Sequence, residues 1–116
     1  MMTFDQYQTF ARRTMNTALN EREARTMTAL GLVGEAGECS ELIKKHVFHN
    51  RALDRDDLQA ELGDVLWYVA ALAPTADLTL NELATANLAK LRWRYPDGFS
   101  QDDSRRRVDV RAEEST

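Results

Sequence analysis

Apolar residues recur every three or four positions through most of the chain, which is the spacing typical of amphipathic helices. The pattern predicts four helices, over residues 3–16, 23–48, 54–73 and 79–93. Thr3 and Asp54 are suited to cap helix starts, and Pro74 ends the third helix. The stretch after Ser100 is charged and nearly free of apolar residues, so we expect a folded domain over residues 1–99 and a disordered tail over residues 100–116.

Composition supports an all-α domain and limits its partners. Two prolines and five glycines in 116 residues favour long helices over a turn-rich sheet protein. The net charge of −4 gives no general reason to bind nucleic acid. With one cysteine and no apolar run long enough for a membrane span, we expect a cytoplasmic protein with neither a nucleic-acid nor a membrane partner.

Three glycines interrupt the second helix at three-residue spacing. Gly31, Gly34 and Gly37 fall along one side of it, and each costs about 1 kcal/mol against alanine in a helix interior. Close approach of another backbone would offset that cost. This stripe, in a thin bundle of four helices, favours a homo-oligomer.

Acidic residues at matching spacing provide the candidate chemistry. Glu35 and Glu38 share one side of the second helix, Glu41 extends the row, and Glu61 and Asp64 repeat the spacing on the third helix. If the two helices return antiparallel, both pairs face one pocket, where clustered carboxylates need a cation. Oxygen ligands suit Mg²⁺, with Mn²⁺ as a substitute. Solvated acids on exposed helix faces are the plain alternative.

Three segments in order resemble the MazG-like branch of the all-α NTP pyrophosphatases. They are GLVGEAGECSELIKK (31–45), ELGDVLWY (61–68) and NLAKLRWRYPDGF (87–99). The resemblance implies a bundle of four to five helices that forms a homodimer or homotetramer. It implies a nucleoside triphosphate substrate and Mg²⁺-dependent hydrolysis to monophosphate and pyrophosphate, with house-cleaning of the nucleotide pool as a family-level role. By position it implies four magnesium ligands: Glu35, Glu38, Glu61 and Asp64.

The first acid of the family motif is replaced by Gly34. Catalysis would then rest on Glu35 and Glu38, with Glu41 as the nearest replacement base, unless the metal alone activates the water. Phosphates and base would meet Lys45, Trp67, Asn87, Lys90 and Arg94. The plain alternatives are that the lysine covers a helix end and that the tryptophan packs in the core. The rival function is a catalytically silent helical protein that binds a nucleotide or a partner.

Overall fold

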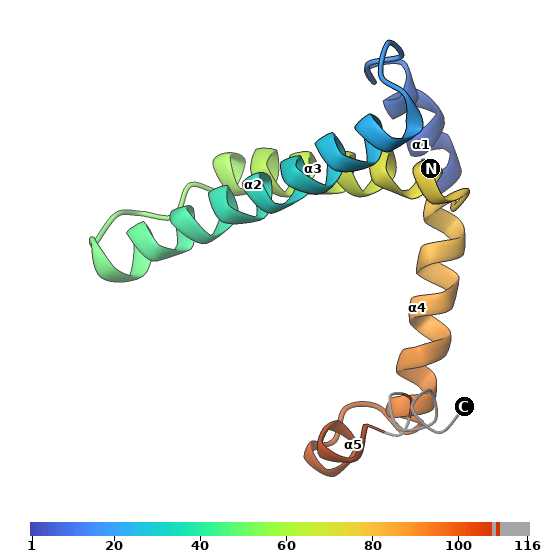
Figure 1. The fold of residues 1–116 in the computed structure, drawn as a ribbon. Helices are drawn as coiled ribbons and strands as arrows, with labels where there is room; N and C mark the ends of the chain where they lie inside the picture. The colour runs from blue at the N-terminus through green and yellow to red at the C-terminus, as the bar shows by residue number, and fades with distance from the viewer. Residues whose placement is uncertain (108, 110–116) are drawn as a thin grey trace. The chain divides into compact units, whose positions relative to one another are not determined.

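The computed structural model describes residues 1–107 and residue 109, and every regular element in that part of the chain is a helix. The elements are α1 (Phe4–Arg12), α2 (Glu21–Phe48), α3 (Arg55–Leu72), the 3-10 helix η1 (Ala73–Ala76), α4 (Leu80–Arg94) and α5 (Gln101–Arg106) (Figure 1). The all-α prediction is confirmed. No helix among these residues has the length and apolar character needed to cross a membrane. The chain forms two compact units, Met1–Leu80 and the described residues from Asn81 onward.

Two of the predicted caps are present. The Gln6 backbone N–H donates to Thr3 Oγ1 at 3.1 Å, and the Thr3 N–H donates in return to the Gln6 side chain. The Asp54 side chain accepts hydrogen bonds from the backbone amides of Asp56 and Asp57 in the first turn of α3. The start of α2 was predicted two residues late, because Asn20 forms a reciprocal cap with Glu23.

The first helix is shorter than the pattern predicts. It ends at Arg12, where the Arg13 and Thr14 amides bond to carbonyls three residues back. The Thr14 hydroxyl also donates to the Ala11 carbonyl at 2.7 Å. Such local bonds tighten and stop a helix, and they free residues 13–20 to form the connection to α2.

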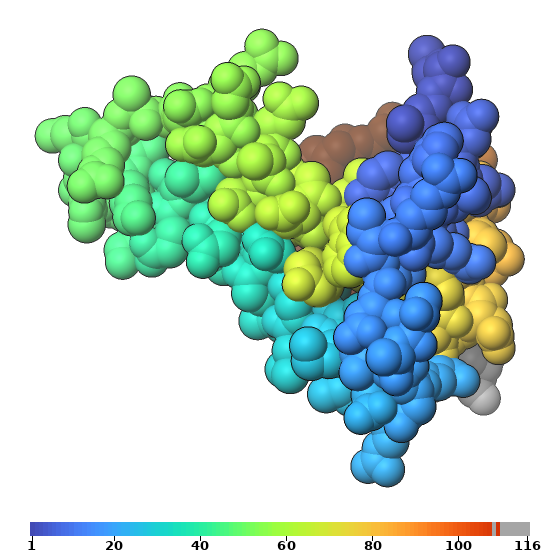
Figure 2. Space-filling view, turned by 90° about the horizontal axis from the view of Figure 1, so that it is seen from above, coloured from blue at the N-terminus to red at the C-terminus, as the bar shows by residue number. Residues whose placement is uncertain are grey.

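Helices α2 and α3 run antiparallel and lie side by side, as Figures 1 and 2 show in teal and green. The close approach expected at the glycine stripe occurs at Gly31, but the neighbour is a side chain. A Cβ built on Gly31 would lie 2.1 Å from a ring atom of Tyr68. At Gly34 and Gly37 a Cβ would meet nothing within 4 Å, so the expected backbone neighbour is absent among the described residues of the chain.

Gln8 joins α1 to the far end of α3. Pro74 has no N–H, so the helical acceptor four residues earlier, the Ala70 carbonyl, loses its usual donor. The Gln8 side-chain amide donates to that carbonyl at 3.0 Å, and its oxygen accepts from the Leu80 amide at 3.2 Å. Buried alanines surround this junction, including Ala11 and Ala71. The described core of this unit therefore sits at the α1 end of the α2–α3 pair.

The second unit contains α4, a turn through Gly98 and α5. Disorder was expected after Ser100, and that prediction is wrong for residues 101–106, which form α5 with Ser100 as its cap. Asp109 is buried against Arg94. The tail prediction for residues 108 and 110–116 lies outside the described residues.

Candidate metal centre and adjoining pocket

The antiparallel helices bring together three of the four predicted ligands. Carboxylate oxygens of Glu35 on α2 and of Glu61 and Asp64 on α3 all lie within 4.8 Å of one another. Glu35 and Glu61 are half-buried and Asp64 is exposed. Glu38 is not part of this three-carboxylate group, although its charge acts on Glu61. The fold thus brings one acid of the first predicted pair, Glu35, to both acids of the second pair, Glu61 and Asp64.

The group carries the electrostatic cost that such proximity implies. A side-chain hydrogen bond with Glu35 raises the pKa of Glu61, and partial burial and repulsion from Glu35, Glu38 and Asp64 raise it further. Among the described residues, no lysine or arginine forms an ion pair with Glu35, Glu61 or Asp64. The described lysines and arginines therefore do not neutralise this negative charge through ion pairs.

A hard divalent cation fits this donor set. The three groups offer only oxygen atoms, from two facing helices, and Asp64 among them is exposed to solvent. No described histidine or cysteine belongs to the cluster, so the softer ligands that zinc prefers are missing from it. Glu35, Glu61 and Asp64 would hold the ion, and its charge would remove the mutual repulsion.

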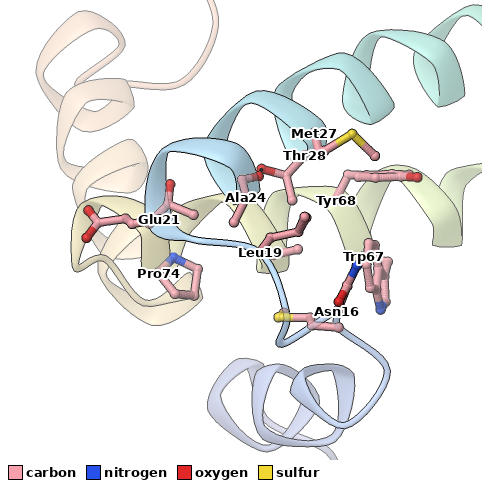
Figure 3. Close-up of a pocket in the computed structure, with 12 residues that line it drawn as sticks. Asn16, Leu19, Glu21, Ala24, Met27, Thr28, Trp67, Tyr68 and Pro74 are labelled. Atoms are coloured by element: carbon pink, nitrogen blue, oxygen red, sulfur yellow. Dashed lines mark hydrogen bonds between the residues drawn. The ribbon is translucent and has the colours of Figure 1, made fainter.

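A pocket lies one helical turn along α3 from this cluster. Its volume is about 370 Å³, and it opens between α2, the end of α3 and the connection over residues 13–20 (Figure 3). Trp67 and Tyr68 form an aromatic corner, with ring centroids 5.0 Å apart and planes at 88°. Met15, Leu19 and Met27 add apolar surface. A mostly apolar pocket with a flat aromatic wall suits a planar ring.

Comparison with known proteins gives a family for this arrangement. The MazG nucleotide pyrophosphohydrolase domain matches residues 23–99, which include the cluster and most of the pocket. The chain belongs to this family. It is also similar to the Gene 37 protein of Mycobacterium phage L5, with 45% identity over 68% of this chain and 73% of that protein. No solved structure matches the chain. As a MazG domain, it belongs to a family of hydrolases that act on nucleotides.

Two other candidate residues on α2, Glu41 and Lys45, lie outside the three-carboxylate group. Glu41 is exposed and pairs with Lys44 at 3.6 Å. It is six residues beyond Glu35, which is about 9 Å along a helix axis. Lys45 is exposed and ten residues beyond Glu35, about 15 Å along the axis. Neither side chain belongs to the three-carboxylate group.

The candidates on α4 share one face of that helix. Asn87, Lys90 and Arg94 follow three- and four-residue spacing, and the first two are exposed. Arg94 is engaged by Asp109, with Nε–Oδ1 at 2.8 Å and a second bond at 2.6 Å. Those hydrogen bonds from Arg94 lower the pKa of Asp109 to about 2. Arg94 could bind a phosphate only if the Asp109 carboxylate released its guanidinium group.

Two residues near the site had no signal in the sequence. Tyr7 on α1 lies near Asp64: burial raises the pKa of its phenol, and the Asp64 charge raises it further. Thr14 accepts a hydrogen bond from Trp67 Nε1 at 2.8 Å. Both contacts join segments more than 50 positions apart, and no local spacing or motif indicates them.

Proposed function

We propose that this MazG domain hydrolyses nucleoside triphosphates to a nucleoside monophosphate and pyrophosphate, with Mg²⁺ held by its acidic cluster. The observation that carries the proposal is the short step along α3 from the carboxylates to the aromatic pocket. Asp64 and Tyr68 are four residues apart, about 6 Å along the helix axis. A nucleotide whose base enters the pocket would therefore bring its first phosphate, rather than its last, to the cluster.

The order of residues along the antiparallel pair supports attack at the α-phosphorus. The pocket lies near Met27 and Tyr68, the cluster follows at Glu35 and Asp64, and Lys45 lies toward the opposite end of α2. The β- and γ-phosphates would extend from the cluster toward that lysine. Water would form the new bond to the α-phosphorus as the bond to the α–β bridging oxygen breaks, so that pyrophosphate leaves.

The chain's own residues have distinct roles in this proposal. Glu35, Glu61 and Asp64 hold the ion, and Glu38, whose charge already reaches Glu61, is the fourth ligand. Bound Mg²⁺ supplies charge neutralisation for the phosphates and a lower pKa for the attacking water. Glu35 and Glu38 are the nearest groups on α2 to receive the proton, with Glu41 about one turn further along. Trp67 and Tyr68 orient the base.

The second unit carries three further candidates for binding phosphate. Asn87, Lys90 and Arg94 present two cations and an amide on one face of α4. Such groups stabilise the charge that develops on a transferring phosphoryl group. We assign these three side chains a phosphate-binding role in the proposed reaction.

We also propose that a second copy of the chain covers the exposed side of the α2–α3 pair, with a dimer favoured over a tetramer. Large apolar side chains are exposed there, among them Leu30 at 66%, Val33 at 72% and Leu62 at 53%. Within Met1–Leu80 the buried apolar residues are few and gather at the α1 end. Exposed apolar surface that extends over several large side chains commonly marks an interface between protein chains.

The test is product analysis across a panel of natural and modified NTPs and dNTPs with Mg²⁺, beside Glu61→Gln. Monophosphate plus pyrophosphate, abolished in the variant and in excess EDTA, is the expected result. Diphosphate plus phosphate would refute attack at the α-phosphorus. If nothing on the panel is hydrolysed while nucleotides still bind, the silent nucleotide-binding protein is the correct alternative.

A further inference from the structure

The aromatic corner of the pocket is held from two sides, by Thr14 and by Gly31, and no functional role has been assigned above to either residue. On one side, Trp67 Nε1 donates to Thr14 Oγ1 at 2.8 Å. The Thr14 hydroxyl itself donates a hydrogen bond to the Ala11 carbonyl at 2.7 Å. Because the hydroxyl has one proton and that proton is used, the oxygen is a fixed acceptor for the indole.

On the other side, Tyr68 occupies the space that a side chain at position 31 would fill. A Cβ at Gly31 would come within 2.1, 2.3 and 2.7 Å of three ring atoms of Tyr68. Contacts below 3.0 Å between a Cβ and another heavy atom do not occur in ordinary structures. The ring can therefore lie against the α2 backbone only because residue 31 is glycine.

These two contacts set the relative position of three segments that line the pocket. Thr14 is followed by Met15, Asn16 and Leu19, which line the pocket. Gly31 lies one turn beyond Met27 and Thr28 on the α2 wall. Loss of either contact would let an aromatic ring turn or let the connection over residues 13–20 move, and the slot for a flat ligand would lose its shape.

We propose that Thr14 and Gly31 are positioning residues for base recognition, acting through Trp67 and Tyr68 respectively. The inference rests on the proposed function in taking a nucleobase as the occupant of the pocket. Neither residue belongs to the three-carboxylate group, so both govern how tightly the ring end of the substrate binds rather than the rate of the chemical step.

The test uses a Trp93→Phe background, in which Trp67 is the one remaining tryptophan of the two in the chain. Binding of nucleoside monophosphates is followed by Trp67 fluorescence in EDTA, so that the metal does not contribute. Steady-state kinetics with Mg²⁺ and the preferred triphosphate give KM and kcat separately. The variants are Thr14→Val, which keeps the shape of the side chain without the hydroxyl, Thr14→Ser, which restores the hydroxyl, and Gly31→Ala.

Two control variants match these changes. Thr9→Val removes a hydroxyl that bonds only within α1, to the Asp5 carbonyl. Gly37→Ala adds a methyl on α2 where nothing lies within 4 Å. Thr14→Val is expected to raise both KM and the monophosphate dissociation constant about fivefold, the worth of one neutral hydrogen bond, with kcat nearly unchanged. Gly31→Ala should raise both by at least as much, Thr14→Ser should recover most of the loss, and the controls should match the parent.

Several results would overturn the inference. They are an unchanged KM and dissociation constant in Thr14→Val, a fall in kcat alone, or failure of Thr14→Ser to recover binding. If Gly31→Ala does not fold, the valine and serine variants still decide the question. Hydrolysis without any monophosphate binding near Trp67 would refute the pocket assignment and leave the proposed function intact. Monophosphate binding that responds to these variants, without hydrolysis, would refute the proposed function alone.

Discussion

Gln8→Leu is the substitution whose effect on stability follows most directly from the fold. The leucine has similar size but cannot bond, so it leaves the Ala70 carbonyl and the Leu80 amide without their side-chain partner in a region where residue 8 is 4% exposed. Each buried polar group left unpaired costs roughly 1–3 kcal/mol, so the variant should lose roughly 2–6 kcal/mol. For a chain of this length, that loss lowers the melting temperature by roughly 10 °C or more.

Denaturant unfolding followed by far-UV circular dichroism measures this loss, with Gln59→Leu as the matched control. Gln59 is exposed on α3, and its replacement should change the stability by no more than about 0.5 kcal/mol. A second substitution tests the cause. Pro74→Ala restores a backbone N–H that can bond to the Ala70 carbonyl, so in that background Gln8→Leu should cost about 1 kcal/mol less. Strict additivity of the two substitutions would refute the explanation.

Three further predictions concern charge. The hydrogen bond with Glu35 raises the pKa of Glu61, so the metal-free protein should lose thermal stability as pH rises through that raised pKa. Mg²⁺ should restore the lost stability. Glu61→Gln should abolish both effects in thermal-shift assays and weaken Mg²⁺ binding at least about tenfold. Asp109→Asn should lower the melting temperature at neutral pH but not near pH 2, since the Arg94 bonds hold the pKa of Asp109 at about 2 and their contribution is lost as pH falls toward that value. Gly34→Glu should raise kcat roughly tenfold relative to Gly34→Gln, which is less than the roughly 10²–10⁴-fold effect of a fully positioned general base. Equal kcat values in the two variants would exclude a catalytic role for an acid at this position.

The parts of the fold that follow from local physics were predictable from the sequence. Thr3 and Asp54 cap their helices because short polar side chains reach the first free amides from that position in any context. The meeting of Glu35 with Glu61 required only two helix periods and a turn between them. The family resemblance added the chemistry, since spacing alone does not distinguish metal ligands from solvated acids.

Glu38 lies three residues from Glu35 on α2 but does not join the three-carboxylate group. Three residues turn a helix by 300°, so the side chains of Glu35 and Glu38 point about 60° apart. Glu35 faces α3 directly, and Glu38 acts on Glu61 through charge without joining the group of oxygens within 4.8 Å. Shared helix faces therefore identify candidates, while the position of the neighbouring helix decides which of them lie within 4.8 Å of one another without a bound ion.

Contacts between distant segments were not predictable from periodicity. Gln8 reads as an ordinary polar position of α1, and its role depends on Pro74 and on a helix start 72 residues away. Thr14 reads as part of the first helix, although it lies beyond the helix end and accepts from Trp67. Each of these contacts depends on how whole helices pack, and it leaves no repeat, cap or motif in the local sequence.

Gly34 stands where the family motif has its first acid, yet the three-carboxylate group still forms. The three carboxylates meet without any contribution from position 34, so the glycine does not disrupt this candidate ligand group. It is not a steric requirement of the single chain either, since a Cβ there would meet nothing within 4 Å. A further carboxylate beside Glu35 would add repulsion to a group that already raises the pKa of Glu61. In this chain the glycine therefore avoids that added repulsion in the metal-free state, and under the proposed function activation of the water would depend on the bound ion and on the acids that remain.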